Sequence, residues 1–198
     1  MKENQIREDK ILSEINLLES QLEKRVPKEF FIKSKTLPIY QKEYEILESI
    51  HQNLITVISG ETGSGKSTQV PQMLLESQYD LNGKICITQP RRLAAKSLCF
   101  RVREEVGHDR SGQIGYQVRF DKEVKEEQNK VLFMTDGILL NEMMSDFLLQ
   151  KYSVIVIDEA HERKLGTDIL ISLLVKVVRI RAQKALLEFT DADQIEQI

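Results

Sequence analysis

The sequence predicts an α/β fold, a parallel sheet with helices on both of its faces. Apolar, β-branched runs of strand length alternate with longer segments of helical periodicity, an order typical of parallel sheets. The first run is apolar at nearly every position, as in a strand buried on both faces, and a glycine-dense turn joins it to the first helix. We expect strands at 54–59, 84–89, 114–118, 130–135 and 153–157, and helices at 66–77, 92–106, 136–145 and 167–181.

The composition is that of an ordinary globular protein, with 30% charged and 41% hydrophobic residues in 198. The net charge of −3 gives no overall basic field, so any contact with a nucleic acid must be local. No apolar run reaches membrane-spanning length, and the first residues, MKENQIREDK, lack a signal-peptide core. We therefore expect no membrane partner. Cys86 and Cys99 fit no metal-binding spacing, which favours two reduced, buried thiols in an intracellular protein.

The chain divides into three parts. Residues 1–36 are expected to form a charged helical extension, with Ile11, Ile15, Leu18 and Leu22 at a 4-3-4 spacing. This pattern covers little more than one heptad, which is too short for a coiled coil. The helix could dock on the domain or on a partner, and the sequence leaves both possibilities open. Residues 37–181 carry the alternating strands and helices. Residues 182–198 turn acidic and lose periodicity, which predicts a frayed helix end and a mobile tail.

The glycine-dense turn matches the phosphate-binding loop G-x-x-x-x-G-K-S/T. Its glycines let backbone N–H groups turn inward, and the N-terminus of the following helix adds positive potential. Lys66 is expected to reach the β and γ phosphates, and the Ser67 hydroxyl to bind Mg²⁺. The predicted nucleoside-triphosphate site comprises Gly60, Glu61, Thr62, Gly63, Ser64, Gly65, Lys66, Ser67 and Thr68.

Two carboxylates follow the last predicted strand. Asp158 lies at the carboxyl end of that strand, where open α/β sheets bind ligands, and is expected to hold Mg²⁺ through its water shell opposite Ser67. Glu159 is placed to orient and deprotonate the attacking water. Adjacent carboxylates are tolerated beside a cation, so the predicted metal site comprises Ser67, Asp158 and Glu159.

Residues 158–163, Asp-Glu-Ala-His-Glu-Arg, resemble motif II of the DEAH-box RNA helicases. The resemblance runs from about Leu37 to Arg181 and includes GETGSGKSTQVPQ (60–72), TQPRRLAA (88–95), GYQVRF (115–120) and TDGILL (135–140). It implies that residues 37–181 form the first of two RecA-like domains, followed in that family by helical and OB-like modules. It also implies that hydrolysis of ATP or another NTP drives the protein 3′ to 5′ along single-stranded RNA.

The resemblance carries over to five residues at the RNA. Arg91 and Arg92 match motif Ia and Thr135 matches motif Ib, positions that hold the RNA backbone in the family. Guanidinium and hydroxyl donors suit phosphates and do not read bases. Arg119 and Phe120 match the Arg-Phe pair of a hairpin-like turn near the RNA.

Two further residues take roles at the nucleotide from the same resemblance. Arg101 matches the arginine that stacks on the base, a contact that gives affinity with little discrimination. We therefore expect all four NTPs to bind nearly equally, and take Gln41 and Gln52 as surface residues rather than adenine readers. His161 matches the residue that couples the γ-phosphate site to the second domain, beside the catalytic Lys66, Asp158 and Glu159.

A subgroup is indicated by residues 144–184, which resemble nucleolar DEAH helicases of small-ribosomal-subunit assembly. Glu43, where many members carry an arginine, points to the same subgroup, and that subgroup implies a location in the nucleus. The sequence contains no Ser-Ala-Thr triplet for motif III and no second RecA-like domain. We therefore expect a fragment that is nearly inactive alone. Its expected partners are single-stranded RNA, the other modules of the same protein and an activator protein.

Two other functions remain open at the level of sequence: a regulatory P-loop module that unwinds nothing, and a DNA-directed helicase. Against the regulatory module, no guanine-specific N-K-x-D element is present, and the Arg91–Arg92 pair has no role in a switch. Only the resemblance argues against a DNA-directed helicase, because contacts to phosphates do not distinguish ribose from deoxyribose.

Overall fold

Five strands form one sheet at the centre of the computed structural model, which describes residues 36–195, with side chains through residue 187. The strand order is β3-β2-β4-β1-β5, and all neighbours are parallel except the β2–β3 hairpin. The predicted parallel α/β sheet is therefore confirmed. The strands are β1 (Lys84–Gln89), β2 (Ile114–Val118), β3 (Asp121–Glu123), β4 (Val131–Thr135) and β5 (Tyr152–Ile157).

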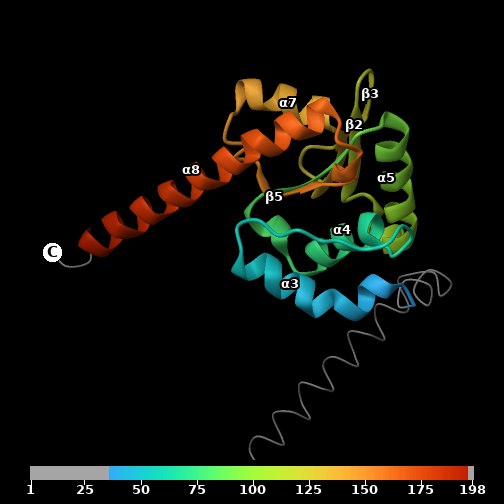
Figure 1. The fold of residues 1–198 in the computed structure, drawn as a ribbon, viewed down its shortest axis with the longest axis horizontal. Helices are drawn as coiled ribbons and strands as arrows, with labels where there is room; N and C mark the ends of the chain where they lie inside the picture. The colour runs from blue at the N-terminus through green and yellow to red at the C-terminus, as the bar shows by residue number, and fades with distance from the viewer. Residues whose placement is uncertain (1–35, 196–198) are drawn as a thin grey trace, which may run out of the picture.

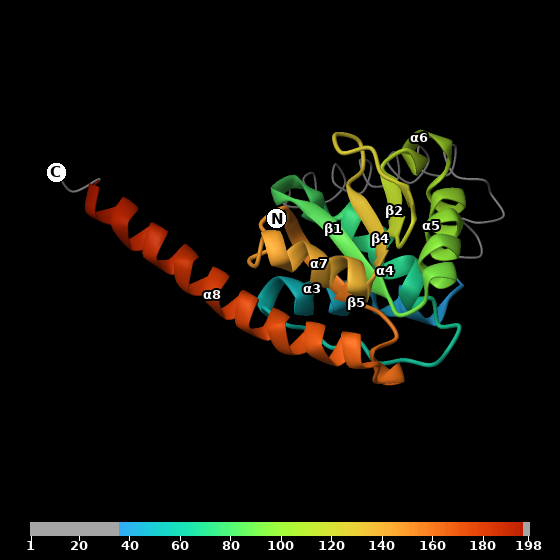
Figure 2. The same ribbon diagram turned by 90° about the horizontal axis from the view of Figure 1, so that it is seen from above.

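Helices cover both faces of the sheet, as predicted. α4 (Lys66–Glu76) and α5 (Arg92–Val106) pack on one face, and α7 (Asp136–Ser145) and α8 (Leu165–Ile195) on the other (Figures 1 and 2). Alternate residues of the central strands supply the two apolar clusters. Val131 and Phe133 of β4 face α4 and α5, whereas Leu132 and Met134 face α7 and α8. This period of two on apolar strands explains a core on each side of the sheet.

Shorter elements complete the described part of the chain: η1 (Pro38–Lys42), η2 (Tyr79–Asn82), α6 (His108–Ser111) and η3 (Ala160–Glu162). A helix that the sequence did not predict, α3 (Glu43–Gln52), packs outside α4 through half-buried Ile46, Leu47 and Ile50. Gln41 and Gln52 are exposed, in agreement with their assignment to the surface.

The strand predicted at 54–59 is wrong. This segment forms no strand in the structure, and Leu54, Ile55 and Val57 are 71%, 55% and 89% exposed. A strand needs a neighbour to pair with its backbone, and β-propensity expresses that context rather than an intrinsic preference. Within the described residues, β5 is the end of the sheet and pairs with β1 alone, so no ladder reaches residues 54–59.

The predicted end of the last helix is also wrong. α8 begins at Leu165 and continues to Ile195, where the sequence predicted an end at 181 and a frayed segment after it. Residues 182–187, Ala-Gln-Lys-Ala-Leu-Leu, are all good helix formers, and neither glycine nor proline interrupts the segment. The second half of α8 projects away from the sheet (Figures 1 and 2). The helix predicted in the N-terminal extension lies outside the described residues.

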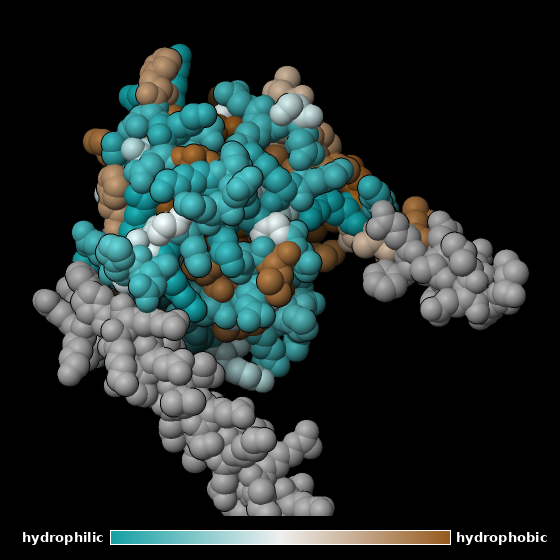
Figure 3. Space-filling view, turned by 180° about the vertical axis from the view of Figure 1, so that it is seen from behind, coloured by the Kyte–Doolittle hydropathy of each residue, from teal (hydrophilic) through white to brown (hydrophobic). Residues whose placement is uncertain are grey.

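The surface and the cysteines agree with the expectations from composition. The face shown in Figure 3 is mostly hydrophilic, with apolar residues in small separate groups. Cys86 and Cys99 are buried and free, as predicted. In the described part of the chain, no helix combines the length and the apolar character needed to cross a membrane.

Candidate functional site

The phosphate-binding loop takes a conformation that requires glycine at two positions. Gly63 and Gly65 have φ angles of +80° and +98°, in the left-handed region. At Gly65 space is also lacking, because a Cβ there would lie 2.9 Å from Leu37 Cδ1 and 3.0 Å from Ile39 Cγ2. Ile39 N donates to Ser64 O at 3.2 Å, so η1 holds the back of the loop. The predicted loop is thus fixed by packing as well as by its glycines.

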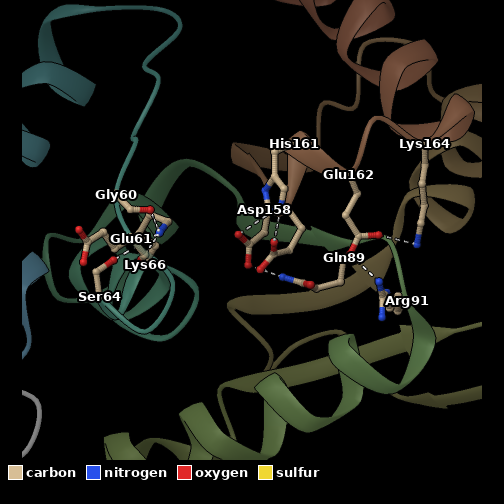
Figure 4. Close-up of polar contacts among 11 residues, drawn as sticks. Gly60, Glu61, Ser64, Lys66, Gln89, Arg91, Asp158, His161, Glu162 and Lys164 are labelled. Carbon is tan, nitrogen blue, oxygen red and sulfur yellow. Dashed lines mark hydrogen bonds and ion pairs between the residues drawn. The ribbon is translucent and has the colours of Figure 1, made fainter.

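Lys66 begins α4, and Gly65 is the residue before its first turn. The Lys66 ammonium donates to Gly60 O at 2.5 Å, to Glu61 O at 2.8 Å and to Ser64 Oγ at 3.3 Å (Figure 4). The lysine therefore lies over its own loop. The first N–H groups of a helix have no acceptor four residues earlier within the helix, and those of α4 lie beside the Lys66 ammonium.

A cavity of about 570 Å³ opens beside this loop. Its volume is within the usual range for small-molecule sites. The loop forms one wall, and η1, α3 and the extended segment 56–59 form the others. The lining includes Lys42, Glu45, Ser49, Thr62 and Lys66.

Asp158 is fastened at the carboxyl end of β5. Its backbone N–H donates to Thr88 O of β1 at 3.2 Å. One carboxylate oxygen accepts from the Gln89 side-chain amide, and the other from the Glu159 N–H at 2.9 Å (Figure 4). Gln89 is only 1% exposed and was missed by the sequence analysis. The sequence did contain a signal for Gln89, since it is a polar residue at the carboxyl end of a buried strand, inside the TQPRR motif.

The turn after Asp158 is strained. Glu159 and Arg163 have φ angles of +53° and +50°, and they bracket η3. Non-glycine residues in this region cost roughly 1–3 kcal/mol each and cluster at functional sites. His161 Nε2 lies 3.4 Å from Glu159 Oε2, and Arg163 is held by a bidentate pair with Asp168, at 2.9 and 3.1 Å. The predicted base and the predicted coupling histidine thus share one turn.

The donor atoms of Ser67 and Asp158 suit Mg²⁺, which prefers oxygen ligands and keeps several waters and phosphate oxygens. In the described residues no group of three or more His, Cys, Asp or Glu side chains converges on one point, and such a Mg²⁺ site does not need one. No hydrogen bond or ion pair between described residues joins Lys66 or Ser67 to Asp158 or Glu159. Figure 4 shows Lys66 and Asp158 in two separate groups of contacts.

The residues predicted at the RNA backbone collect at the carboxyl ends of neighbouring strands. Gln89, the last residue of β1, pairs in register with Thr135, the last residue of β4. Arg91 precedes α5 and Arg92 begins it, and both are exposed. Thr135 precedes α7. Three of the five predicted RNA residues therefore lie at the same edge of the sheet as Asp158.

Arg119 and Phe120 form the two-residue turn between β2 and β3, since Val118 pairs with Asp121. The predicted hairpin-like turn is confirmed. Phe120 has a φ of +69° and is 88% exposed, and the Arg119 guanidinium lies 4.8 Å from the centre of its ring. Both side chains are presented to solvent at the tip of the hairpin.

Arg101 lies on α5, and its Nε donates to Glu105 Oε1 at 2.6 Å. Glu105 and Glu162 are two further charged residues that the sequence analysis did not single out. Glu162 contacts Arg91 at 3.1 Å and Lys164 at 2.9 Å. The signal for Glu162 was its place within the DEAHER motif, whereas nothing in the local sequence marked Glu105.

Known proteins match most of the chain. Residues 49–190 match the family described as AAA domain. The chain is 54% identical over 153 residues to "Probable ATP-dependent RNA helicase DHR1" of Saccharomyces cerevisiae, covering 74% of this chain and 12% of that protein. It is 49% identical over 155 residues to "ATP-dependent RNA helicase DEAH13" of Arabidopsis thaliana, covering 75% of this chain and 12% of that protein. It is 52% identical over 150 residues to "Probable ATP-dependent RNA helicase DHX35 homolog" of Caenorhabditis elegans, covering 73% of this chain and 20% of that protein.

The chain therefore spans 12–20% of the length of these three relatives. The family match, residues 49–190, includes the phosphate-binding loop and the Asp-Glu-Ala-His turn, whose geometry is described above. On these matches the chain belongs to a P-loop family, that of the AAA domain, and it is similar in sequence to a segment of these DEAH-type RNA helicases.

Proposed function

We propose that this chain is the first RecA-like motor domain of a longer ATP-dependent RNA helicase. The proposal rests on two features that occur together: a glycine-dependent phosphate loop at the start of α4, and Asp158 directly after β5. Ligands of open α/β sheets bind at such strand ends. The names of the relatives support ATP and RNA as the substrates.

In the proposed reaction, Lys66 and the amides of the loop neutralise the phosphates of the nucleotide. Ser67 and Asp158 would hold Mg²⁺, which supplies charge stabilisation at the phosphates when it is bound. Glu159 accepts a proton from the attacking water, because its carboxylate follows Asp158 and is partly open to solvent, at 39% exposure. His161, which contacts Glu159, faces outward at 79% exposure, where a second domain can meet it.

The proposed RNA path crosses the carboxyl edge of the sheet. Arg91, Arg92 and Thr135 lie there with donors that suit phosphates, so binding follows the backbone and not the bases. Arg119 and Phe120 add a charged and a stacking group at the hairpin tip. A second RecA-like domain, the C-terminal modules and an activator protein are the proposed partners. A second domain and C-terminal modules accord with the small share of the relatives' length that this chain covers.

A role in small-ribosomal-subunit assembly and a place in the nucleolus are the narrower part of the proposal. They rest on the resemblance of residues 144–184, on Glu43 and on the acidic stretch after Arg181, which resembles an insertion of that subgroup. Imaging of the tagged longer protein tests the location. Exclusion from the nucleus would contradict it without touching the proposed chemistry.

The proposed activity is tested by ATP hydrolysis in the longer protein with single-stranded RNA, with single-stranded DNA, and with neither. Glu159→Gln serves as the inactive control. We expect RNA to stimulate hydrolysis and the same RNA to be unwound. Equal stimulation by DNA would favour a DNA-directed motor, and hydrolysis that neither polymer changes would favour a regulatory module.

A further inference from the structure

Glu105 is a buried carboxylate that lies outside every motif named above. Its side chain is 7% exposed, and it accepts three hydrogen bonds. Gln69 Nε2 and Gln72 Nε2 donate to Oε2 at 2.8 and 2.7 Å, and Arg101 Nε donates to Oε1 at 2.6 Å. Burying a charge is costly unless partners satisfy it, and here both oxygens are used. The cluster is therefore built around this carboxylate.

The donors link the phosphate loop to Arg101. Gln69 and Gln72 lie one turn apart on α4, the helix that the loop begins. Gln69 Nε2 also donates to Thr68 Oγ1 at 3.1 Å, and Thr68, the residue after the loop motif, donates its Oγ1 to Gly65 O of the loop at 3.3 Å. Arg101 and Glu105 lie one turn apart on α5. A continuous series of hydrogen bonds thus runs from the loop, across two helices, to the Arg101 guanidinium.

This arrangement fixes one edge of the guanidinium and leaves its side chain 37% exposed. An arginine that stacks on a base is most effective when its plane is already oriented, because less rotamer freedom is lost on binding. A salt bridge on the surface would orient it weakly. A carboxylate that is itself buried and held by two amides has little freedom to move.

We propose that Glu105 is a positioning residue that holds Arg101 for the base of a nucleotide bound at the phosphate loop. Gln69 and Gln72 keep the carboxylate in register with the loop, so that the base platform and the phosphate site move as one unit. The inference rests on the proposed function, since it requires a nucleotide at the loop.

The test compares a ligand that has a base with one that lacks it. Binding of ATP and of inorganic triphosphate, each with Mg²⁺, is measured by calorimetry on the 198-residue chain and on Glu105→Gln. We expect ATP to bind about five- to fiftyfold more weakly to the variant, in the range of a lost stacking contact, and triphosphate to change less than about twofold. Glu104→Gln, which alters an exposed glutamate on the same helix, is the matched control and should change neither.

The remaining arms separate positioning from a structural effect. Arg101→Ala should show the same split between ATP and triphosphate, and the double variant Arg101→Ala/Glu105→Gln should be no weaker than Arg101→Ala alone. If Glu105→Gln reduces the amount of folded chain, Glu105→Asp, which keeps the charge and shortens its reach, should give the same split. Equal losses for both ligands, or no loss for either, would overturn the positioning role. Failure of the unaltered chain to bind either ligand would instead overturn the proposed function.

Discussion

Arg91 Nη2 lies 3.1 Å from Glu162 Oε1, an ion pair that joins the segment after β1 to the turn after β5 (Figure 4). Glu162 also binds Lys164 Nζ at 2.9 Å, and Lys164 donates to Pro90 O at 3.2 Å. The hydrogen bond from Lys164 and the charge of Arg91 lower the pKa of Glu162, so the pair persists somewhat below the pH at which a free glutamate titrates. A proposed RNA residue is thereby attached to the turn that carries Glu159.

The ion pair predicts how RNA binding responds to Glu162→Gln. If RNA follows the proposed path, Glu162 would compete with its phosphates for Arg91, and the charge of Glu162 would repel the RNA backbone. We expect the variant to bind single-stranded RNA roughly two- to fivefold more tightly at low salt, with the difference shrinking as salt rises. Fluorescence anisotropy with a labelled RNA measures it. Glu127→Gln, at an exposed glutamate in the turn before β4, is the control, and an equal gain there would show a general charge effect instead.

Glu159→Gln is expected to separate binding from hydrolysis. The amide keeps the shape of the side chain but cannot take a proton from water, so turnover by the longer protein should fall by about a hundredfold or more. Mg²⁺-ATP affinity should stay within about twofold. Steady-state hydrolysis and calorimetry provide the two readings. Turnover at the unaltered rate would mean that another group acts as the base.

Gly65→Ala is expected to destabilise the fold by more than about 2 kcal/mol, because left-handed strain adds to the contact with Leu37 and Ile39. Gly63→Ala carries the strain without the contact and should cost about 1 kcal/mol. Gly112→Ala, with ordinary φ and open space, should change stability by less than about 1 kcal/mol. Urea unfolding gives all three values. An equal cost at the three glycines would argue against this loop geometry.

The buried Cys99 thiol predicts a dependence on alkaline pH. Burial raises its pKa from 9.0 to about 11. The unfolded state therefore loses its proton first, so stability is complete below about pH 9 and falls as pH rises toward 11. At pH 10.5 the unaltered chain should have lost about 2 kcal/mol more than Cys99→Ala, relative to pH 8. Urea unfolding at the two pH values tests this, and parallel losses in both chains would show that the thiol ionises freely.

Much of the fold followed from local sequence. Strands 84–89 and 114–118 and helices 92–106 and 136–145 have the predicted bounds, since apolar periodicity and packing agree there. Segment 54–59 has an equally apolar pattern, yet pairing decides strand formation, and within the described residues no strand pairs with it. The acidic composition after residue 181 led to the wrong prediction that α8 ends there, because charge alone does not end a helix.

The candidate site divides in the same way. The loop and Asp158 were found because their motifs are contiguous in sequence. Gln89 and Glu105 were not found, because each contacts a residue far away in the sequence. Gln89 contacts Asp158, and Glu105 contacts Gln69. Only the parallel register of β1 with β5 and the packing of α5 on α4 bring these pairs together. The local sequence marked Gln89 as a polar residue at the end of a buried strand, but no local pattern shows which residue Gln89 or Glu105 contacts.

The most direct test of the nucleotide site is the affinity of the 198-residue chain for Mg²⁺-ATP, compared with Lys66→Ala. We expect the unaltered chain to bind and the variant to bind about tenfold more weakly or worse, because charge-assisted hydrogen bonds from the ammonium to the phosphates are lost. Lys176→Ala, at an exposed lysine of α8, should bind as the unaltered chain does. Equal affinity of the unaltered chain and Lys66→Ala would contradict the assignment of this loop as the nucleotide site.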